Sequence, residues 1–385
     1  NPVNVVRVCE SLTCELFGAH KLLQDIKKLE NKNIKVVPGP CMGRCNVAPT
    51  VCVGKNYVDV ANFDKVKKTI DEKNFDPFIP DYINLSSYKK KGGYEIANKI
   101  KNGVISKKQV LDSLNESGLK GKGGAGFPTG KKWEIVSNYN GKKYVAVNGD
   151  EGEPGTFKDR SYLESDPHRF LEGALIASYF INAQKVYIYM RDEYPTVIKI
   201  LLDEINKMED EEIIPKDFFI VRRGAGAYIC GEESAMIESI EGKRGLPRHR
   251  PPYVAEIGLF GCPTLTNNLE TLFWVRDIIE KGAKWFAEKG SNGNKGFHSF
   301  SVSGRVKNPG VKVAPAGITI QQLIDEYCDG MADGHTFKGY LPGGASGGIL
   351  PATMNDIPLD YGSKELMDAG CCLLYTSPSP RDGRE

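Results

Sequence analysis

The sequence predicts an α/β protein made of three modules, and two observations support this. Strand-like and helix-like apolar patterns alternate over residues 1–75 and again from about residue 95 to 290, as in layered α/β domains. Residues 297–350 then change character and begin with strand-like alternation. A length of 385 residues allows two or three domains at roughly 100–200 residues each. A hydrophobic fraction of 40% and a charged fraction of 26% are typical of a globular protein with an ample core.

The first module, residues 1–75, is predicted to be a small sandwich of strands and helices. Apolar residues at helical spacing between Leu16 and Leu29 predict a helix, and short apolar runs predict strands. Because cysteines lie in the connections, the pattern indicates a thioredoxin-like fold. The expected elements are strands at 3–8, 34–37, 51–53 and 57–60 and helices at 15–30 and 64–72.

Residues 76–290 are predicted to form a larger layered α/β domain, and residues 291–360 a small β-grasp module. A linker with Pro77 and Pro80 separates the first two modules. The β-grasp prediction depends on a strand at 297–306, a Pro-Gly turn and a helix at 319–327. In the larger domain we expect strands at 144–147, 185–190 and 218–221 and helices at 109–117, 167–180, 195–208 and 232–241.

Charge and hydropathy exclude several classes of protein. Fifty-one basic and 49 acidic side chains leave a formal charge of +2, which argues against bulk nucleic-acid binding or a polybasic membrane surface. No apolar run approaches the ~18 residues that a membrane span requires. A secretory signal pattern is also missing. We therefore expect a cytoplasmic protein, with a peripheral position on the inner face of a membrane complex left open.

The two ends of the chain carry expectations of their own. The sequence opens on Asn1 rather than Met, which is consistent with missing N-terminal residues. Residues 361–370 are predicted to start a truncated helical domain. Residues 371–385, rich in Pro, Ser and charge, cannot continue that helix and are expected to be a non-native tail of adaptor or vector origin.

Four cysteines form two closely spaced pairs, Cys9-x4-Cys14 and Cys41-x3-Cys45, both expected on loops. Four thiolates can hold a 2Fe–2S cluster, two at each iron, and soft sulfur ligands favour iron–sulfur, zinc or copper(I). Zinc ribbons prefer two-residue gaps in both pairs, so the spacing favours 2Fe–2S while leaving zinc and unrelated thiols open. The cysteines expected to be buried apolar residues are Cys52, Cys230, Cys262 and Cys328.

A glycine-rich segment contains the pattern G-x-G-x-x-G at Gly121, Gly123 and Gly126. A dinucleotide-binding fingerprint should follow a strand, whereas the preceding residues have the pattern of a helix, so the ordinary interpretation fails. A loop with exposed N–H groups beside Lys131 and Lys132 still suits a phosphate. A purely structural loop is an equally good explanation of this segment alone.

Two acidic segments follow predicted strands. Asp150, Glu151 and Glu153 come directly after the strand at 144–147, at the carboxyl end where open α/β sheets bind ligands. Glu232 and Glu233 follow a strand and a glycine turn and begin a helix, where they could accept hydrogen bonds from ribose hydroxyls or simply cap the helix. Further polar and aromatic candidates in turns are Arg250, Tyr253, Asn267, Asn268 and Thr271.

Together these segments closely resemble the flavoprotein (51 kDa-type) subunit of respiratory complex I and its soluble relatives. The first module resembles the thioredoxin-like 2Fe–2S domain of the same system, and its fusion to the flavoprotein resembles the diaphorase subunit of NAD-dependent formate dehydrogenases or hydrogenases. The third module resembles the family's SLBB-like β-grasp domain. The matching stretches are RVCESLTCELFGA, GPCMGRC, GKGGAGFPTGKKW (121–133), VNGDEGEPGTFKDR (147–160), GAGAYICGEESA (224–235), RPPY (250–253), GLFGCPTLTNNLET (258–271), HSFSVSGRVKNPGV (298–311) and LPGGASGGIL (341–350).

The resemblance implies an FMN site and an NAD(H) site. Phe127 and Tyr253 would flank the adenine, Arg250 would meet the phosphates of NADH, and Glu153 and Glu233 would contact its ribose or nicotinamide parts. We further hypothesise a catalytic role for Glu153, whose negative charge near the flavin would tune the flavin potential. The residues implied for FMN are Gly121, Gly124, Lys132, Asn148, Asp150, Tyr228, Gly231, Glu232, Asn267, Asn268 and Thr271.

The implied function is that of an NADH:acceptor oxidoreductase (diaphorase) subunit. Hydride would move between NAD(H) and FMN, and single electrons would pass to iron–sulfur clusters of a formate dehydrogenase, hydrogenase or complex I type assembly. The family also carries a C-terminal helical 4Fe–4S domain, whose cysteine motif is absent from this sequence, so we expect at best activity with artificial acceptors. The alternatives are a non-catalytic 2Fe–2S carrier or scaffold and a zinc-binding adaptor.

Overall fold

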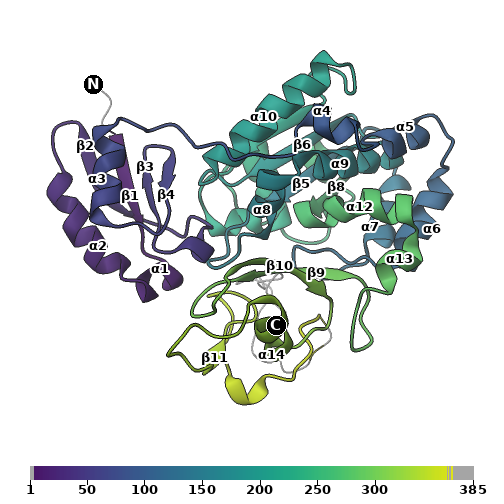
Figure 1. Cartoon of the computed structure of the whole chain (residues 1–385). Coiled ribbons are helices and arrows are strands. Elements are labelled where there is room, and N and C mark those ends of the chain that lie inside the picture. The colour runs from purple at the N-terminus through teal and green to yellow at the C-terminus, as the bar shows by residue number, and fades with distance from the viewer. Residues whose placement is uncertain (1–3, 362, 364–365, 367–385) are drawn as a thin grey trace.

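The computed structural model describes residues 4–361, 363 and 366, and three modules follow one another along this part of the chain (Figure 1). The predicted start of a helical domain at 361–370 therefore lies largely outside the described residues, and the predicted tail at 371–385 lies entirely outside them. No helix in the described part is both long and apolar enough to cross a membrane.

The first module is a four-stranded mixed sheet in the order β2-β1-β3-β4, with helices packed against it (Figure 1). The first two strands pair in parallel, and the last two form an antiparallel hairpin. Val6, Val8 and Val51 are fully buried between sheet and helices. The elements are β1 (Asn4–Cys9), α1 (Leu12–Leu16), α2 (Ala19–Ile26), a 3-10 turn (Lys27–Leu29), β2 (Ile34–Gly39), a 3-10 turn (Cys45–Val47), β3 (Val51–Val53), β4 (Asn56–Val58) and α3 (Phe63–Asp71).

The helix predicted at 15–30 is wrong in one respect, because it is two helices, α1 and α2, separated at Gly18. Gly18 has φ +86°, a left-handed conformation that side chains disfavour and glycine adopts readily. The apolar spacing continues across this break, so periodicity alone does not reveal it. The prediction that the first cysteine pair lies on a loop is also wrong, because Cys9 ends strand β1 and Cys14 lies within α1.

The second module is built on a parallel sheet in the order β7-β6-β5-β8, with helices on both faces. Its strands are β5 (Tyr144–Gly149), β6 (Lys185–Met190), β7 (Phe219–Arg223) and β8 (Thr264–Asn268). Its helices are α4 (Leu85–Lys89), α5 (Glu95–Lys101), α6 (Lys107–Ser117), α7 (Thr129–Ser137), α8 (Lys158–Ser165), α9 (Pro167–Ile181), α10 (Pro195–Asp210), α11 (Glu233–Ile240), α12 (Leu269–Lys281) and α13 (Ala283–Ala287), with 3-10 turns at Tyr228–Gly231 and Leu259–Gly261.

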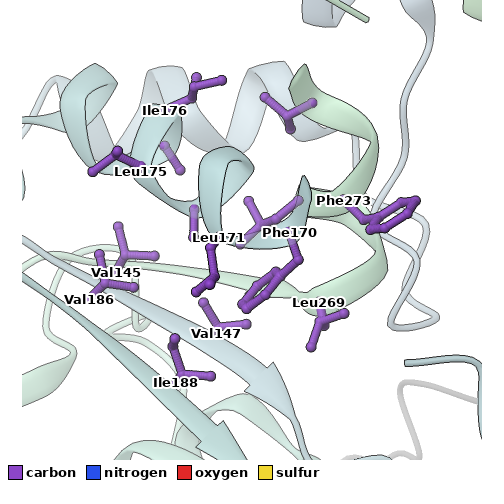
Figure 2. Close-up of a cluster of buried hydrophobic side chains, with 14 of the residues drawn as sticks. Val145, Val147, Phe170, Leu171, Leu175, Ile176, Val186, Ile188, Leu269 and Phe273 are labelled. Carbon is purple, nitrogen blue, oxygen red and sulfur yellow. The ribbon is translucent and has the colours of Figure 1, made fainter. Parts of the chain in front are cut away.

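Successive residues of the central strand β5 serve opposite faces of the sheet. Val145 and Val147 point to the face covered by α9 and α12 (Figure 2), whereas Ala146 belongs to a second cluster formed with α11. This is the pattern of a parallel sheet buried on both sides. Figure 2 shows the first cluster, with labelled side chains Val145, Val147, Phe170, Leu171, Leu175, Ile176, Val186, Ile188, Leu269 and Phe273.

Several elements of this module were not predicted, namely strand β8 and helices α4, α5, α7, α8, α12 and α13. Strand β8, which pairs with β5, was missed because its Thr-Leu-Thr alternation is short and follows a proline-containing turn. Part of the predicted linker forms α4, and it is held by two buried carboxylates. Glu172 accepts a hydrogen bond from the hydroxyl of Tyr88 at 2.6 Å, and Glu204 accepts one from the hydroxyl of Tyr82 at 2.7 Å.

The third module consists, in the described part, of two small antiparallel sheets and a short helical segment (Figure 1). The strand expected at 297–306 ends at Val302. The β-grasp assignment and the domain limits of 75, 290 and 360 remain predictions. The elements are β9 (Phe297–Val302), β10 (Gly310–Pro315), α14 (Ile320–Gln322) with a π-helical turn (Leu323–Tyr327), β11 (Gly339–Tyr340), β12 (Leu350–Pro351) and a 3-10 turn (Ala352–Met354).

The carboxylate of Glu204 provides a test of how the segment leading into α4 is held to the second module, since it accepts hydrogen bonds from Tyr82 and from the N–H of Leu85. Burial alone would raise its pKa, but hydrogen bonds from His168, Lys207 and Tyr82 outweigh burial and lower the pKa from 4.5 to about 2. A carboxyl group with a lowered folded-state pKa stabilises the fold above its unfolded pKa and loses that contribution as the pH falls through the folded value. Glu204 should therefore contribute about 3 kcal/mol at neutral pH.

We expect Glu204→Gln to lower the melting temperature at pH 7, and the difference from the wild type to shrink between pH 4.5 and 2, where circular dichroism can follow unfolding. Glu288→Gln is the matched control, because this exposed carboxylate pairs with the likewise exposed Lys284 at the surface. A difference that stayed constant over this pH window would contradict the assignment.

Candidate functional site

The carboxyl ends of all four parallel strands meet at one edge of the sheet. Register aligns Asn148 of β5 with Asn268 of β8, and Gly149 with Met190 of β6. Met190 in turn lies opposite Arg223 of β7. The loops that leave neighbouring strands at this edge therefore start close to one another. In open α/β sheets, ligands bind at this edge, outside the carboxyl ends of the strands.

The glycine-rich loop, residues 121–128, runs from α6 to α7 and lies against the start of α12. It follows a helix, as predicted, and the Rossmann arrangement is therefore excluded. The backbone N–H of Lys122 donates to the hydroxyl of Thr271 at 2.8 Å. A Cβ atom at Gly123 would lie 3.0 Å from the Cβ of Asn268, closer than most Cβ contacts, so the loop's close approach to this strand end favours glycine.

The amides that end β8 are held from two sides. Trp133 donates its indole N–H to the Oδ1 of Asn267 at 2.9 Å. Asn268 donates to Asp159 at 2.8 Å and its Oδ1 lies 3.3 Å from the Nζ of Lys158. Both amides are thus fixed in place at the N-terminus of α12, where backbone N–H groups favour an anion.

Asp150 presents a buried carboxylate oxygen to this edge. Its Oδ2 has no hydrogen-bond partner among the described residues, and burial raises the pKa of Asp150 to about 7. Asn148 accepts the N–H of Asp150 at 3.1 Å and donates to the carbonyl of Gly231 at 2.8 Å. A buried acceptor without a partner costs free energy, so the site is suited to a ligand that donates a hydrogen bond there.

The neighbouring Glu151 has a structural role. Its carboxylate is buried and accepts hydrogen bonds from the N–H groups of Asp159 at 2.9 Å and Arg160 at 3.3 Å, and from the hydroxyl of Tyr194 at 3.0 Å. Burial, assisted by the charge of Asp159, raises the pKa of Glu151 to about 7. Glu151 therefore holds the start of α8 and does not face a ligand site.

The two acids at the start of α11 differ in role. Glu232 caps the helix by accepting the N–H groups of Ser234 and Ala235, each at 3.0 Å, as the capping alternative predicted. Glu233 instead pairs with Lys132 at 3.1 Å. Burial alone would raise the pKa of Glu233, but Lys132 and further partners lower it to about 2.

Arg250 links both acids, since its guanidinium contacts Glu232 and lies 3.3 Å from Glu233. Phe127 and Tyr253 keep 42% and 57% of their surface exposed and are free to stack on a ligand. No ring contact joins these two side chains in the described structure. The structure thus brings Arg250 into contact with Glu232 and Glu233, whereas the two predicted aromatic side chains do not contact each other in the described part of the chain.

Glu153 and Tyr228 both reach toward the third module. Glu153 accepts the N–H of Ser346 at 2.8 Å and its hydroxyl at 2.6 Å. The hydroxyl of Tyr228 lies 3.4 Å from that of Ser346. Ser346 was not selected from the sequence, and its position in the glycine-rich segment 341–350 was the one available signal.

The four paired cysteines come together in the first module, each at most 4% exposed. The Sγ atoms of Cys41 and Cys45 are 3.5 Å apart. Hydrogen bonds from Cys45 and Cys9 hold the pKa of the Cys41 thiol well below its usual range, and a hydrogen bond from Cys9 lowers the pKa of Cys14. The four sulfurs therefore form one continuous group.

The arrangement of the cysteines in two neighbouring pairs matches the ligand set of a 2Fe–2S cluster. No set of three or more His, Cys, Asp or Glu side chains in the described structure is arranged to hold one metal ion. A 2Fe–2S cluster needs only two sulfurs at each of two irons, which two neighbouring pairs supply. Of the other cysteines, Cys52, Cys230 and Cys328 are buried as predicted, whereas the prediction for Cys262 is wrong because it lies partly exposed after the turn at Leu259–Gly261.

Comparison with known proteins decides the family. A profile described as the Nuo51 FMN-binding domain matches residues 114–277, and one described as a thioredoxin-like [2Fe-2S] ferredoxin matches residues 2–74. An NADH-quinone oxidoreductase subunit of Rhizobium meliloti (strain 1021) is 42% identical over 304 residues, which is 77% of this chain and 72% of that protein. The chain belongs to this family of NADH-quinone oxidoreductase subunits.

The corresponding subunit of Aquifex aeolicus (strain VF5) is 41% identical over 305 residues, 77% of this chain and 71% of that protein. Among solved structures, a chain of an NAD+-reducing [NiFe]-hydrogenase superposes with a TM-score of 0.82 at 28% identity, covering 94% of this chain and 67% of that chain. This member of the family therefore has an FMN-binding domain and a 2Fe–2S ferredoxin domain. The close approach at Gly123, the partnerless oxygen of Asp150 and the group of four sulfurs fit these cofactors.

The cluster ligands can be tested by replacing one sulfur. We expect Cys41→Ser to lose most of its iron and its 2Fe–2S absorption and electron paramagnetic resonance signals, since the cluster would lack one of four thiolates. Cys52→Ala is the matched control, because Cys52 is buried in the same module but only donates to the carbonyl of Gly54. Loss of the cluster in both variants, or in neither, would contradict the assignment.

Proposed function

We propose that this chain is the NADH-oxidising flavoprotein subunit of a multisubunit redox complex, with FMN at the carboxyl edge of the parallel sheet. One observation carries the proposal: the glycine-rich loop meets the N-terminus of α12 at that edge, through the hydrogen bond from Lys122 to Thr271 and the close approach of Gly123 to Asn268. When bound, FMN supplies the ability to accept a hydride from NADH and to release electrons singly.

The chain's own residues would bind and orient the two ligands. Lys132, the N–H groups of the glycine-rich loop and the amides at the start of α12 offer positive charge and donors to a phosphate. Asp150 offers its free oxygen to a hydrogen-bond donor of the flavin. The proposed FMN contacts are Gly121, Gly124, Lys132, Asn148, Asp150, Tyr228, Gly231, Glu232, Asn267, Asn268 and Thr271.

For NADH we propose that Phe127 and Tyr253 stack on the adenine and that Arg250 meets the phosphates, while Glu153 and Glu233 accept hydrogen bonds from its hydroxyl or amide groups. Support comes from the exposure of both rings and from the position of Arg250 beside both acids. These side chains would position the nicotinamide against the flavin, and the reaction requires no side-chain nucleophile.

The finer partner assignment is a soluble hydrogenase or formate dehydrogenase of the NAD-dependent type. The hydrogenase chain supports this, because its structural match covers 94% of this chain and so includes the 2Fe–2S module. Mass spectrometry of subunits that co-purify with the natively expressed protein tests it. A quinone-reducing set of subunits would contradict it.

The function is tested by loading the protein with FMN and adding NADH without oxygen. We expect the flavin absorption to bleach and an artificial acceptor such as ferricyanide to be reduced. Gly123→Ala should weaken FMN binding roughly tenfold, since 1.4 kcal/mol of lost contact has that effect and the new Cβ pushes on Asn268. Cluster signals without any flavin bleaching would favour the non-catalytic carrier.

Glu153 is proposed to act through its charge. Because a nearby carboxylate disfavours the anionic reduced flavin, we expect Glu153→Gln to raise the flavin midpoint potential in a redox titration. Ser346→Ala is a useful companion, since it removes the hydroxyl that donates to Glu153 but leaves the charge. An unchanged midpoint in Glu153→Gln would contradict the role.

A further inference from the structure

One cavity of about 400 Å³ is lined by both cofactor modules. Pro40 and Cys41 contribute from the first module, and Asp150, Gly152 and Tyr228 contribute from the edge of the parallel sheet. Cys41 is a predicted cluster ligand, and Asp150 carries the partnerless oxygen assigned to the flavin site. The cavity is therefore the space in which the two sites face each other.

Arg191 joins the two walls of this cavity. It follows β6 directly, is 4% exposed, and lines the same space. Its guanidinium donates to the carbonyl of Cys41 and, at 2.8 Å, to the carbonyl of Glu151, while its Nε donates to Glu193 at 3.2 Å. The planar, multidentate guanidinium suits a group that must bind two carbonyls and a carboxylate at once.

Other contacts hold the Cys41–Cys45 edge of the sulfur group to the second module. Phe157 belongs to the same buried cluster as both cysteines. Arg160 donates to the carbonyl of Gly43 at 2.8 Å, and a Cβ atom at Gly43 would collide with the ring of Tyr194. Together with Arg191, these contacts attach the Cys41–Cys45 edge to the second module.

The opposite edge, Cys9–Cys14, faces the third module instead. Thr13 lies 3.2 Å from the hydroxyl of Ser303, and Arg305 donates to the carbonyl of Leu16 at 2.8 Å. Arg305 also lies over the ring of Phe17, at 4.3 Å from its centroid. Of the four paired cysteines in the described structure, Cys41 alone lines the cavity shared with Asp150, and Cys45 lies beside it with the two Sγ atoms 3.5 Å apart.

We propose that Arg191 is a positioning residue that fixes Cys41 at the wall of the flavin cavity, so that electrons pass between flavin and cluster at the Cys41–Cys45 edge. This inference rests on the proposed function, because it takes the cavity to be that of the flavin. One electron leaves the reduced flavin and enters the oxidised cluster, and no bond forms or breaks at Arg191. NADH is the reductant.

The test compares two arginines that bind the backbone of the first module at opposite edges. In FMN-loaded protein, Arg191→Met should slow cluster reduction roughly tenfold or more, since small misplacements of reacting groups have effects of this size. Flavin bleaching by NADH should be retained. Arg305→Met is the matched control and should leave both rates unchanged. Stopped-flow absorption and freeze-quench electron paramagnetic resonance report flavin and cluster separately.

Photochemical reduction of the flavin without NADH separates this inference from the proposed function. Failure of NADH to bleach the flavin contradicts the proposed function alone. The role of Arg191 is overturned if, after photoreduction of the flavin, the cluster is reduced at the same rate in Arg191→Met as in the wild type. It is also overturned if Arg305→Met slows cluster reduction as much as Arg191→Met does. If Arg191→Met does not retain its cluster, Arg191→Lys, which keeps the positive charge, replaces it in the test. We then expect a rate of cluster reduction between those of the wild type and of a variant without the charge, and a wild-type rate would overturn the role.

Discussion

The buried carboxylate of Glu151 is the interaction on which the rest of the structure depends. It ties the loop after β5 to the start of α8 and to Tyr194, and so fixes a short segment that every module contacts. On either side of it, Asp150 faces the shared cavity, Glu153 reaches Ser346 of the third module, and Phe157 shares a buried cluster with two cysteines of the first. A loop of this kind can carry function because a rigid sheet and a buried anchor position it.

Charge is concentrated where this loop meets the end of β8. Lys158 is buried between Asp159 at 2.7 Å and Glu270 at 3.1 Å, and these two acids raise its pKa although burial alone would lower it. Removing one member would leave an uncompensated buried charge, which is strongly destabilising. The same group holds Asn268 at the start of α12, so the site's geometry and the stability of this region depend on one network.

Much of the site followed from local sequence. The rule that carboxyl ends of parallel strands share an edge selected Asp150, Glu151 and Glu153, and the structure places Asp150 and Glu153 at one cavity there, whereas Glu151 anchors the start of α8. Arg191 also follows a strand directly, but no local feature distinguishes it from a surface arginine. Arg191 matters because its guanidinium donates to the carbonyl of Cys41, which lies 150 residues away along the chain.

The sequence by itself determined the alternation of strands and helices, the cysteine spacing and the glycine-rich loops, because hydrophobic period, ligand spacing and backbone freedom are local properties. It also determined the family, through motifs that are continuous in the chain. Only the tertiary structure decided which acids are capping groups, where α1 and α2 separate, and which edge of the sulfur group faces the flavin cavity. Those outcomes depend on which distant segments supply hydrogen-bond partners to buried polar groups, and that choice is made by packing of the whole chain.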